Sequence, residues 1–137
     1  MAAPGRRQAR ERALELLYEA EAKDAEPVEI IDGLPVAPHG YTVALVTGVA
    51  QSRPELDEVI ARYARGWTLE RMPAVDRNLL RLACFELAHR PDVPTAVVID
   101  EAVELAKQFS TEESGRFVNG MLSRIAAEVR GDGDTAP

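Results

Sequence analysis

Apolar residues recur at intervals of three and four along most of this chain, and this spacing constrains the fold more than any other feature of the sequence. Such intervals place apolar side chains on one face of an α-helix, whereas a half-buried strand needs strict alternation of apolar and polar residues. The sequence contains no such alternating stretch and no internal repeat. It therefore predicts an all-α fold, a single-domain helical bundle of about six to seven helices.

Proline, glycine and capping residues divide the chain into the expected helices. We expect helices at 5–23, 39–52, 54–66, 74–90 and 95–109, and a last one opened by a capping box formed by Ser110 and Glu113. The segment 24–38 contains three prolines and reads as a mobile loop. The domain should then span 1–130, and the tail 131–137 should be disordered because it has nothing to pack.

Composition excludes several classes of protein. A chain of 137 residues with 46% apolar and 28% charged residues is an ordinary globular domain with one core. Its single cysteine, Cys84, can form neither an internal disulfide nor a metal cage, which indicates a reducing cytoplasm. No segment reaches the roughly 20 apolar residues of a membrane span, so we expect a soluble, cytoplasmic protein with no membrane contact.

Catalytic and metal-binding patterns are weak. The carboxylates Asp100, Glu101 and Glu104 share a helical face but have no convergent histidine, and His39 and His89 lack the spacing of metal ligands. No glycine-rich phosphate loop is present. We therefore expect no enzyme activity, no cofactor and no metal site.

Any RNA-binding site must be local, because a net charge of -7 is incompatible with a broad basic face. Arg6, Arg7 and Arg10 lie at the start of the first predicted helix, where positive charge opposes the helix dipole, and Tyr18 projects within the same arc. Guanidinium groups beside an aromatic ring suit single-stranded RNA. An alternative remains open, in which these arginines only pair with acids elsewhere in the chain.

A second basic feature lies on the last predicted helix, where Arg116, Gly120 and Arg124 recur every four residues beside Phe117. A glycine between two arginines leaves a notch that admits a phosphate or a flat base. The same glycine could instead serve close packing between helices. Both interpretations remain open.

Glu86 projects into the apolar arc of the predicted helix 74–90, so its carboxylate should be buried. A buried carboxylate needs hydrogen-bond donors. We expect backbone amides of the loop 92–95 to supply them, which makes Glu86 a structural residue rather than a catalytic acid.

Three ordered blocks of the sequence closely resemble proteins of the NusB family of bacterial transcription antitermination factors. These blocks are RRQARERALELLYEAE, VDRNLLRLACFEL and DVPTAVVIDEAVELAKQFSTEESGRFVNGML. The resemblance implies two helical subbundles packed into one domain, without catalytic activity. It also implies binding to the boxA element of ribosomal RNA leader transcripts together with NusE, a small-subunit ribosomal protein, in an antitermination complex with RNA polymerase. The family includes both monomers and homodimers.

The resemblance also assigns roles to individual residues. It places Asp76 and its neighbour Arg77 at the surface that faces the ribosomal protein, and Glu113 at a position that tunes RNA affinity. The RNA-binding positions of the family match the residues already found from spacing: Arg6, Arg7, Arg10, Tyr18, Arg116 and Phe117, with Gly120 and Arg124 on the same helix. On this interpretation the two basic features form one RNA surface.

Two other interpretations remain. A related helical domain precedes the catalytic part of some ribosomal RNA cytosine methyltransferases, although this chain lacks a glycine-rich cofactor loop and a Pro-Cys nucleophile motif. The chain could also be a pure protein-interaction module whose arginines serve only solubility.

Overall fold

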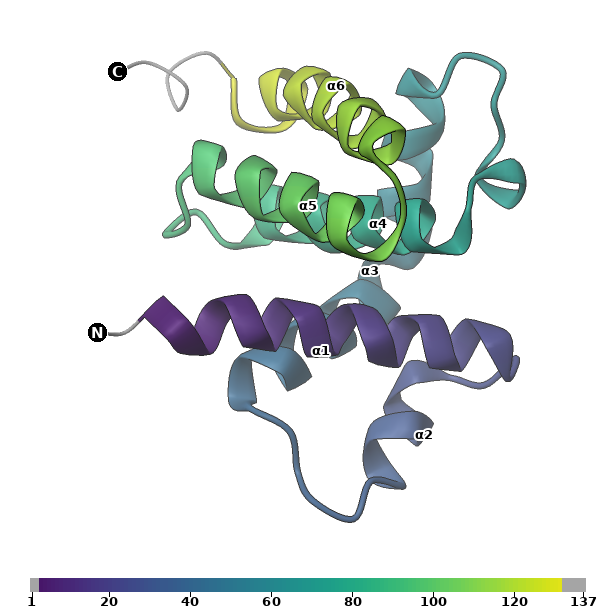
Figure 1. Ribbon diagram of the computed structural model, residues 1–137, viewed down its shortest axis with the longest axis vertical. Coiled ribbons are helices and arrows are strands. Elements are labelled where there is room, and N and C mark those ends of the chain that lie inside the picture. Colours follow the sequence, from purple (N-terminus) through teal and green to yellow (C-terminus); the bar gives the residue numbers. More distant parts are fainter. Residues whose placement is uncertain (1–2, 132–137) are drawn as a thin grey trace.

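The computed structural model describes residues 3–131 and contains only helices in that range, which confirms the predicted all-α fold. These residues form six α-helices and one short 3₁₀-helix, and the six α-helices are labelled in Figure 1. In chain order these are α1 (Ala3–Ala22), α2 (Pro27–Asp32), α3 (Gly40–Tyr63), η1 (Leu69–Arg71), α4 (Ala74–His89), α5 (Thr95–Phe109) and α6 (Glu112–Arg130).

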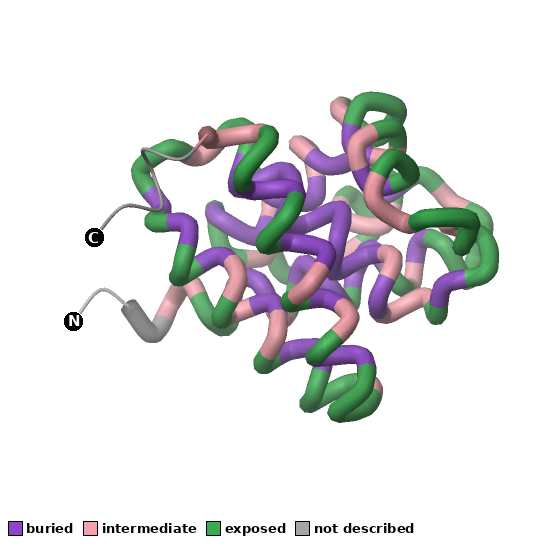
Figure 2. Tube along the Cα trace, turned by 90° about the horizontal axis from the view of Figure 1, so that it is seen from above, coloured by how far each residue is buried: buried purple, intermediate pink, exposed green. Residues whose placement is uncertain are grey.

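The helices pack as two groups that share one core. The helices α1, α2 and α3 contact one another, and α4, α5 and α6 form the second group. In Figure 1, α1 and α2 lie on one side of the molecule and α5 and α6 on the other. Helix α4 contacts α1 and α3 as well as its own group, and every residue from Asn78 to Leu87 is buried. Figure 2 shows the buried parts of the chain gathered in the middle of the molecule. Helix α4 therefore holds the two groups together.

Helix α3 runs without interruption through Pro54, so the predicted division into helices 39–52 and 54–66 is wrong. Proline inside a helix removes one backbone hydrogen bond and clashes with the preceding turn. Here both halves of α3 contribute to one buried stripe, formed by Leu45, Val49, Leu56 and Ile60. Burial of this stripe offsets the cost of the proline, whose own side chain is exposed.

The segment 24–38, predicted as a loop because it contains three prolines, includes the short helix α2. Pro27 occupies the first turn of α2, where its missing N–H costs nothing. Ile30 and Ile31 then pack against the main core while half-buried. The segment is therefore partly anchored, and its mobility stays a prediction.

The last helix begins one residue later than the predicted capping box. Thr111, not Ser110, is the N-cap, and its Oγ1 accepts the backbone N–H of Ser114 at 2.9 Å. Ser110 instead ends α5, which matches its predicted bounds of 95–109. The tail predicted to be disordered lies, apart from Gly131, outside the described residues.

A buried ion pair ties α1 to α4. Arg10 donates from Nε to both carboxylate oxygens of Glu86, at 2.9 and 3.1 Å, and from Nη2 to Oε2 at 2.9 Å. The Tyr41 hydroxyl, from α3, donates to the same Oε2 at 2.5 Å. We call these three residues the Arg10–Glu86–Tyr41 cluster. Burial of Glu86, which is 2% exposed, is confirmed, but the predicted partners are wrong, because side chains of α1 and α3 take the place of the amides of loop 92–95.

The cluster matters because a charge buried without a partner is costly. Transfer of an ion from water into a protein interior costs several kcal/mol, which only a well-aligned counterion and further hydrogen bonds can offset. The fork of Arg10 meets the carboxylate of Glu86 on two nitrogens, and Tyr41 supplies an additional donor. Each member therefore depends on the other two.

Replacing Glu86 with Ala should lower the free energy of unfolding by about 3–5 kcal/mol, because Arg10 would remain buried without its counterion. Denaturant unfolding followed by circular dichroism measures this loss. The matched control is Glu15→Ala, which breaks the exposed Arg12–Glu15 pair at 3.1 Å and should cost less than about 1 kcal/mol. Equal losses in the two variants would show that the cluster does not stabilise the fold.

Candidate RNA-binding surface

The start of α1 and the loop before α5 enclose a groove of about 420 Å³, which we call the arginine groove. Its walls carry the guanidinium groups of the first helix, two acids and an apolar strip, and are formed chiefly by Arg6, Arg7, Arg10, Asp92, Val97 and Glu101. Val97 is an exposed apolar residue. The groove thus combines guanidinium groups with an exposed apolar side chain.

Arg6 and Arg7 reach the surface of this groove, and both are paired with acids. Arg6 Nη2 lies 3.4 Å from Asp92 Oδ2, and Arg7 Nε donates to Glu101 Oε1 at 3.0 Å. The alternative in which the arginines pair with acids elsewhere in the chain therefore describes this structure. It does not exclude RNA, because exposed ion pairs of this kind are weak and can exchange partners.

Arg10 does not project from the surface with Arg6 and Arg7, contrary to the predicted arc. Its side chain is 7% exposed, and Nε and Nη2 are held by Glu86. The helical projection was calculated for an isolated helix, and packing of α1 on α4 covers that part of the arc. Arg10 lines the inner end of the arginine groove, with Nη1 4.0 Å from Glu101 Oε1. Arg10 adds positive charge to the groove, but its side chain cannot move to contact a ligand because Glu86 holds it in place.

Tyr41 is surrounded by guanidinium groups. Arg6 lies over its ring at 4.3 Å from the centroid, and Arg90 lies at 4.9 Å. Burial and the hydrogen bond to Glu86 raise the pKa of the Tyr41 phenol to about 12. Tyr41 therefore stays neutral, donates to Glu86, and orients Arg6 through a cation–π contact.

Arg130 fixes the loop that carries Asp92, a role that the sequence analysis missed. Its guanidinium donates to the carbonyl oxygens of Leu87, Val93 and Arg90 at 2.9, 2.7 and 2.8 Å. These bonds satisfy carbonyls at and just beyond the end of α4. The available signal was an arginine in the last turn of a helix followed by Gly131, a pattern typical of helix ends rather than of ligand sites.

Tyr18 is the exposed aromatic residue of α1, with 47% of its surface accessible. It lies three helical turns after Arg7 on the same face, about 16 Å along the helix axis. This agrees with the predicted arc for Tyr18 and Arg7. An aromatic ring at this distance is available for stacking on a base several nucleotides from a phosphate held by Arg7.

A second hollow of about 380 Å³, which we call the aromatic pocket, lies at the start of α6. Phe117 forms one wall and meets Trp67 edge-on, with ring centroids 5.0 Å apart. Trp67 was not among the predicted site residues, although it is the only tryptophan and follows a glycine in a loop. Both rings are partly exposed.

Arg116 and Arg124 of α6 are exposed, and Gly120 between them is open to solvent on one side. A Cβ added at Gly120 would meet only Arg124 Nη1, at 3.8 Å. The interpretation that Gly120 serves close helix packing is therefore wrong. At Gly48 of α3, by contrast, an added Cβ would lie 2.2 Å from the Phe85 ring, so close packing does require glycine there.

Asp76 lines the aromatic pocket but does not face solvent, because it is 2% exposed. Its Oδ2 accepts a hydrogen bond from the Ser114 hydroxyl at 3.1 Å, while Oδ1 has no partner among the described residues. Burial raises the pKa of this carboxyl, and the bond from Ser114 opposes the rise. Contact with a protein partner at Asp76 stays a prediction, and it requires a group that enters the pocket.

Arg77 is also engaged within the chain. Its Nη1 donates to the carbonyl oxygens of Leu69 and Met72 at 2.8 and 2.7 Å, and its Nη2 pairs with Glu21. Arg77 thus anchors η1 to α1 and α4, and its contact with a protein partner stays a prediction. Glu113 is exposed at the rim of the aromatic pocket.

The arginine groove and the aromatic pocket lie at opposite ends of α5. The arginine groove includes Val97 near the start of this helix, and the aromatic pocket includes Ser110 at its end. A helix of 15 residues spans about 22 Å. A ligand that contacts both must be extended, and the sequence analysis did not anticipate this separation.

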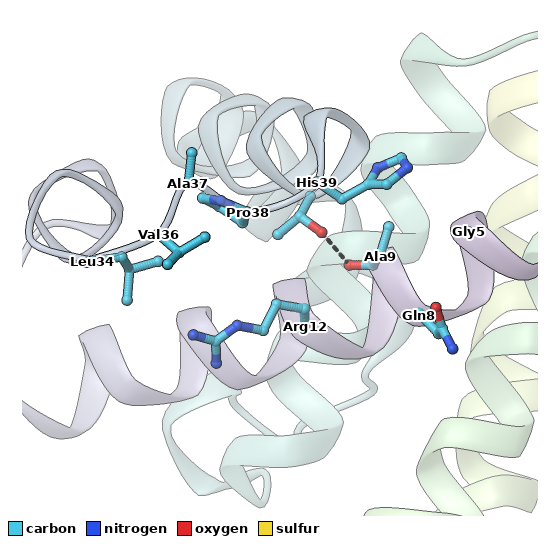
Figure 3. Close-up of a pocket in the computed structure, with 10 residues that line it drawn as sticks. Gly5, Gln8, Ala9, Arg12, Leu34, Val36, Ala37, Pro38 and His39 are labelled. Atoms are coloured by element: carbon cyan, nitrogen blue, oxygen red, sulfur yellow. Dashed lines mark hydrogen bonds between the residues drawn. The ribbon is translucent and has the colours of Figure 1, made fainter.

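A third groove, of about 380 Å³, lies between α1 and the segment that precedes α3. Figure 3 shows Leu34, Val36 and Pro38 opposite Ala9 and Arg12 of α1. Arg12 is paired with Glu15. This groove is mainly apolar, so we do not expect it to bind RNA.

Two further observations bear on function. No helix in the range 3–131 is long and apolar enough to cross a membrane. Cys84 is buried, and burial raises the pKa of its thiol to about 12, so its side chain serves as a small core residue rather than a nucleophile.

Comparison with known proteins gives a consistent result. The model of the NusB family matches residues 7–127. The transcription antitermination protein NusB of Salinispora arenicola is 54% identical over 130 residues, which cover 90% of this chain and 96% of the relative. The protein of the same name from Acidothermus cellulolyticus is 50% identical over 130 residues, covering 90% of this chain and 88% of the relative.

Solved structures show the same fold. NusB of T. maritima superimposes with a TM-score of 0.86 at 35% identity, covering 98% of this chain and 99% of that structure. A complex of the antitermination factors NusB and NusE with double-stranded RNA contains a chain that matches with a TM-score of 0.80 at 27% identity, covering 92% of this chain and 98% of the other.

The buried carboxyl of Asp76 should make stability depend on pH. Because its folded-state pKa is raised above the ordinary value of 3.8, the protonated form is favoured by folding, and this contribution is lost as pH rises through the range just above that value. Between about pH 4 and pH 7 the wild type should therefore lose stability relative to Asp76→Asn. Thermal unfolding of both proteins, with exposed Asp100→Asn as the control for net charge, measures the difference. A constant difference across this range would contradict the assignment.

Proposed function

Because the chain belongs to the NusB family of transcription antitermination proteins, we propose that it binds the boxA element of ribosomal RNA leader transcripts together with the ribosomal protein that acts as NusE. The chain is a non-catalytic antitermination factor, as its family is. We extend the proposal to an antitermination complex with RNA polymerase, which would act in the cytoplasm where ribosomal RNA is transcribed.

The observation that carries the RNA proposal is the arginine groove. The half-buried Arg6 and the exposed Arg7 line this groove together with the apolar side chain of Val97. Phosphates favour guanidinium forks, and an apolar wall suits the face of an unstacked base. The chain's net charge of -7 makes such a local cluster the natural place for RNA.

From the arginine groove we propose that the RNA extends past Tyr18 toward the start of α6. Tyr18 offers a ring for stacking, and Arg116 and Phe117 supply a cation and an aromatic edge near the aromatic pocket. Gly120 leaves room beside Arg124 for a phosphate. An extended path is needed because the arginine groove and the aromatic pocket are separated by the length of α5.

The protein partner is proposed to dock at the aromatic pocket. A ribosomal protein is basic, and the unpartnered Oδ1 of Asp76 is a buried acceptor in the pocket that Trp67 and Phe117 also line. Aromatic faces and a carboxylate together favour a lysine or arginine side chain. Exposed Glu113, in the first turn of α6, adds negative charge three residues before Arg116 and would weaken RNA binding there, which supports its proposed tuning role.

Replacing Arg6 and Arg7 together with Ala should weaken binding to a boxA oligonucleotide and flatten its salt dependence. Loss of two phosphate contacts should reduce the slope of log affinity against log salt by about 1.4, taking about 0.7 for each contact with a single strand. Fluorescence anisotropy at several salt concentrations measures the slope. Arg12→Ala with Arg53→Ala is the matched control, since it removes the same charge from exposed positions outside the arginine groove.

An unchanged slope in the Arg6 and Arg7 variant would contradict the proposed RNA contacts. The same titration with the ribosomal protein present tests the partner. RNA affinity should rise, and by linkage the partner should bind more tightly by the same factor when RNA is bound. Absence of RNA binding in both conditions would favour the alternative of a pure protein-interaction module.

A further inference from the structure

Each arginine at the mouth of the arginine groove is held by an acid, and each acid lies between two arginines. Asp92 is 3.4 Å from Arg6 and also 3.4 Å from Arg90. Glu101 is 3.0 Å from Arg7 and 4.0 Å from Arg10. The two carboxylates thus occupy the positions between guanidinium groups where an RNA phosphate would form the strongest charge-assisted hydrogen bonds.

We propose that Asp92 and Glu101 set the RNA affinity of this protein by competing with phosphate for Arg6 and Arg7. The inference rests on the proposed function and adds a mechanism to it. In the free protein the carboxylates hold the guanidinium groups. When RNA binds, its phosphates replace the carboxylates, and the released acids turn to solvent.

The charges of the groove support this exchange. With Glu86 included, three carboxylates face the four guanidinium groups of Arg6, Arg7, Arg10 and Arg90. The free groove therefore carries little net positive charge, despite its arginines. A phosphate gains full attraction only after a carboxylate has left, so the acids weaken binding to any polyanion that cannot displace both.

The geometry separates exchangeable pairs from fixed ones. The Arg10–Glu86 pair is bidentate and buried, so RNA cannot compete for it. The Arg6–Asp92 and Arg7–Glu101 contacts each join one nitrogen to one oxygen at the surface. An exposed ion pair of this kind changes a binding equilibrium by at most a few-fold, so a phosphate can replace the carboxylate at little cost.

The direct test is Glu101→Gln, which keeps the shape of the side chain and removes its charge. We expect boxA RNA to bind about two- to five-fold more tightly than to the wild type. The matched control is Glu104→Gln, an exposed acid one turn further along α5 that does not line the groove. It changes net charge equally and should have a smaller effect. Asp92→Asn tests the other pair and should also tighten binding.

The coupling between Glu101 and Arg7 distinguishes competition from general electrostatics. In the Arg7→Ala background, Glu101→Gln should lose most of its effect, because the guanidinium group it would release is absent. A thermal melt of each variant checks that the fold is retained.

Several outcomes would overturn the inference. Equal gains for Glu101→Gln and Glu104→Gln would show that only net charge matters, and weaker binding by Glu101→Gln would show that Glu101 orients Arg7 for RNA. If the wild type binds boxA RNA and Glu101→Gln brings no gain, this inference fails while the proposed function stands. If neither protein binds the RNA with the ribosomal protein present, the proposed function fails and the inference fails with it.

Discussion

The buried pair between Arg10 and Glu86 is the interaction on which the rest of this structure depends. It joins the two groups of helices at the point where α1 crosses α4, and Tyr41 of α3 completes it. Because a buried charge cannot be left alone, the pair fixes the rotation of α1 about its axis. That rotation decides that Arg6 and Arg7, rather than Arg10, reach the surface, and so it forms the arginine groove.

An acidic chain can bind RNA only where the fold gathers its arginines, and this fold gathers them beside acids. Asp92 is positioned by a loop that Arg130 holds through backbone carbonyls, and Glu101 projects from the second turn of α5. The same framework thus places both the cations and their competitors. At the other end of α5, the aromatic pocket is lined by two aromatic rings and by the buried carboxyl group of Asp76. The arginine groove favours an anionic ligand and the aromatic pocket a cationic one, so the two surfaces can bind two different ligands.

Much of the fold could be predicted from the sequence because local signals agreed with the packing. Helix α5 begins after Pro94 and ends before Ser110, as predicted, and apolar spacing identified the buried face of α4. Pro54 led to a wrong prediction of two helices, because tertiary burial of α3 outweighs the local preference of proline to begin a helix. For the site, spacing found Arg6, Arg7 and Tyr18 but could not show that Glu86 would select Arg10 as its partner, because that choice depends on how α1 crosses α4. The burial of Asp76 was missed for the same reason.

The side-chain Nε–H signals of the arginines, observed by nitrogen-15 NMR during titration with boxA RNA, test the central claim most directly. If the Arg10–Glu86–Tyr41 cluster is structural and the arginine groove binds phosphate, the signals of Arg6 and Arg7 should move with RNA concentration. The signal of Arg10, whose Nε–H is held by Glu86 at 2.9 Å, should stay nearly fixed and exchange slowly with water. A shift of Arg10 as large as that of Arg7 would contradict this account, as would RNA-dependent shifts confined to the groove beside Arg12.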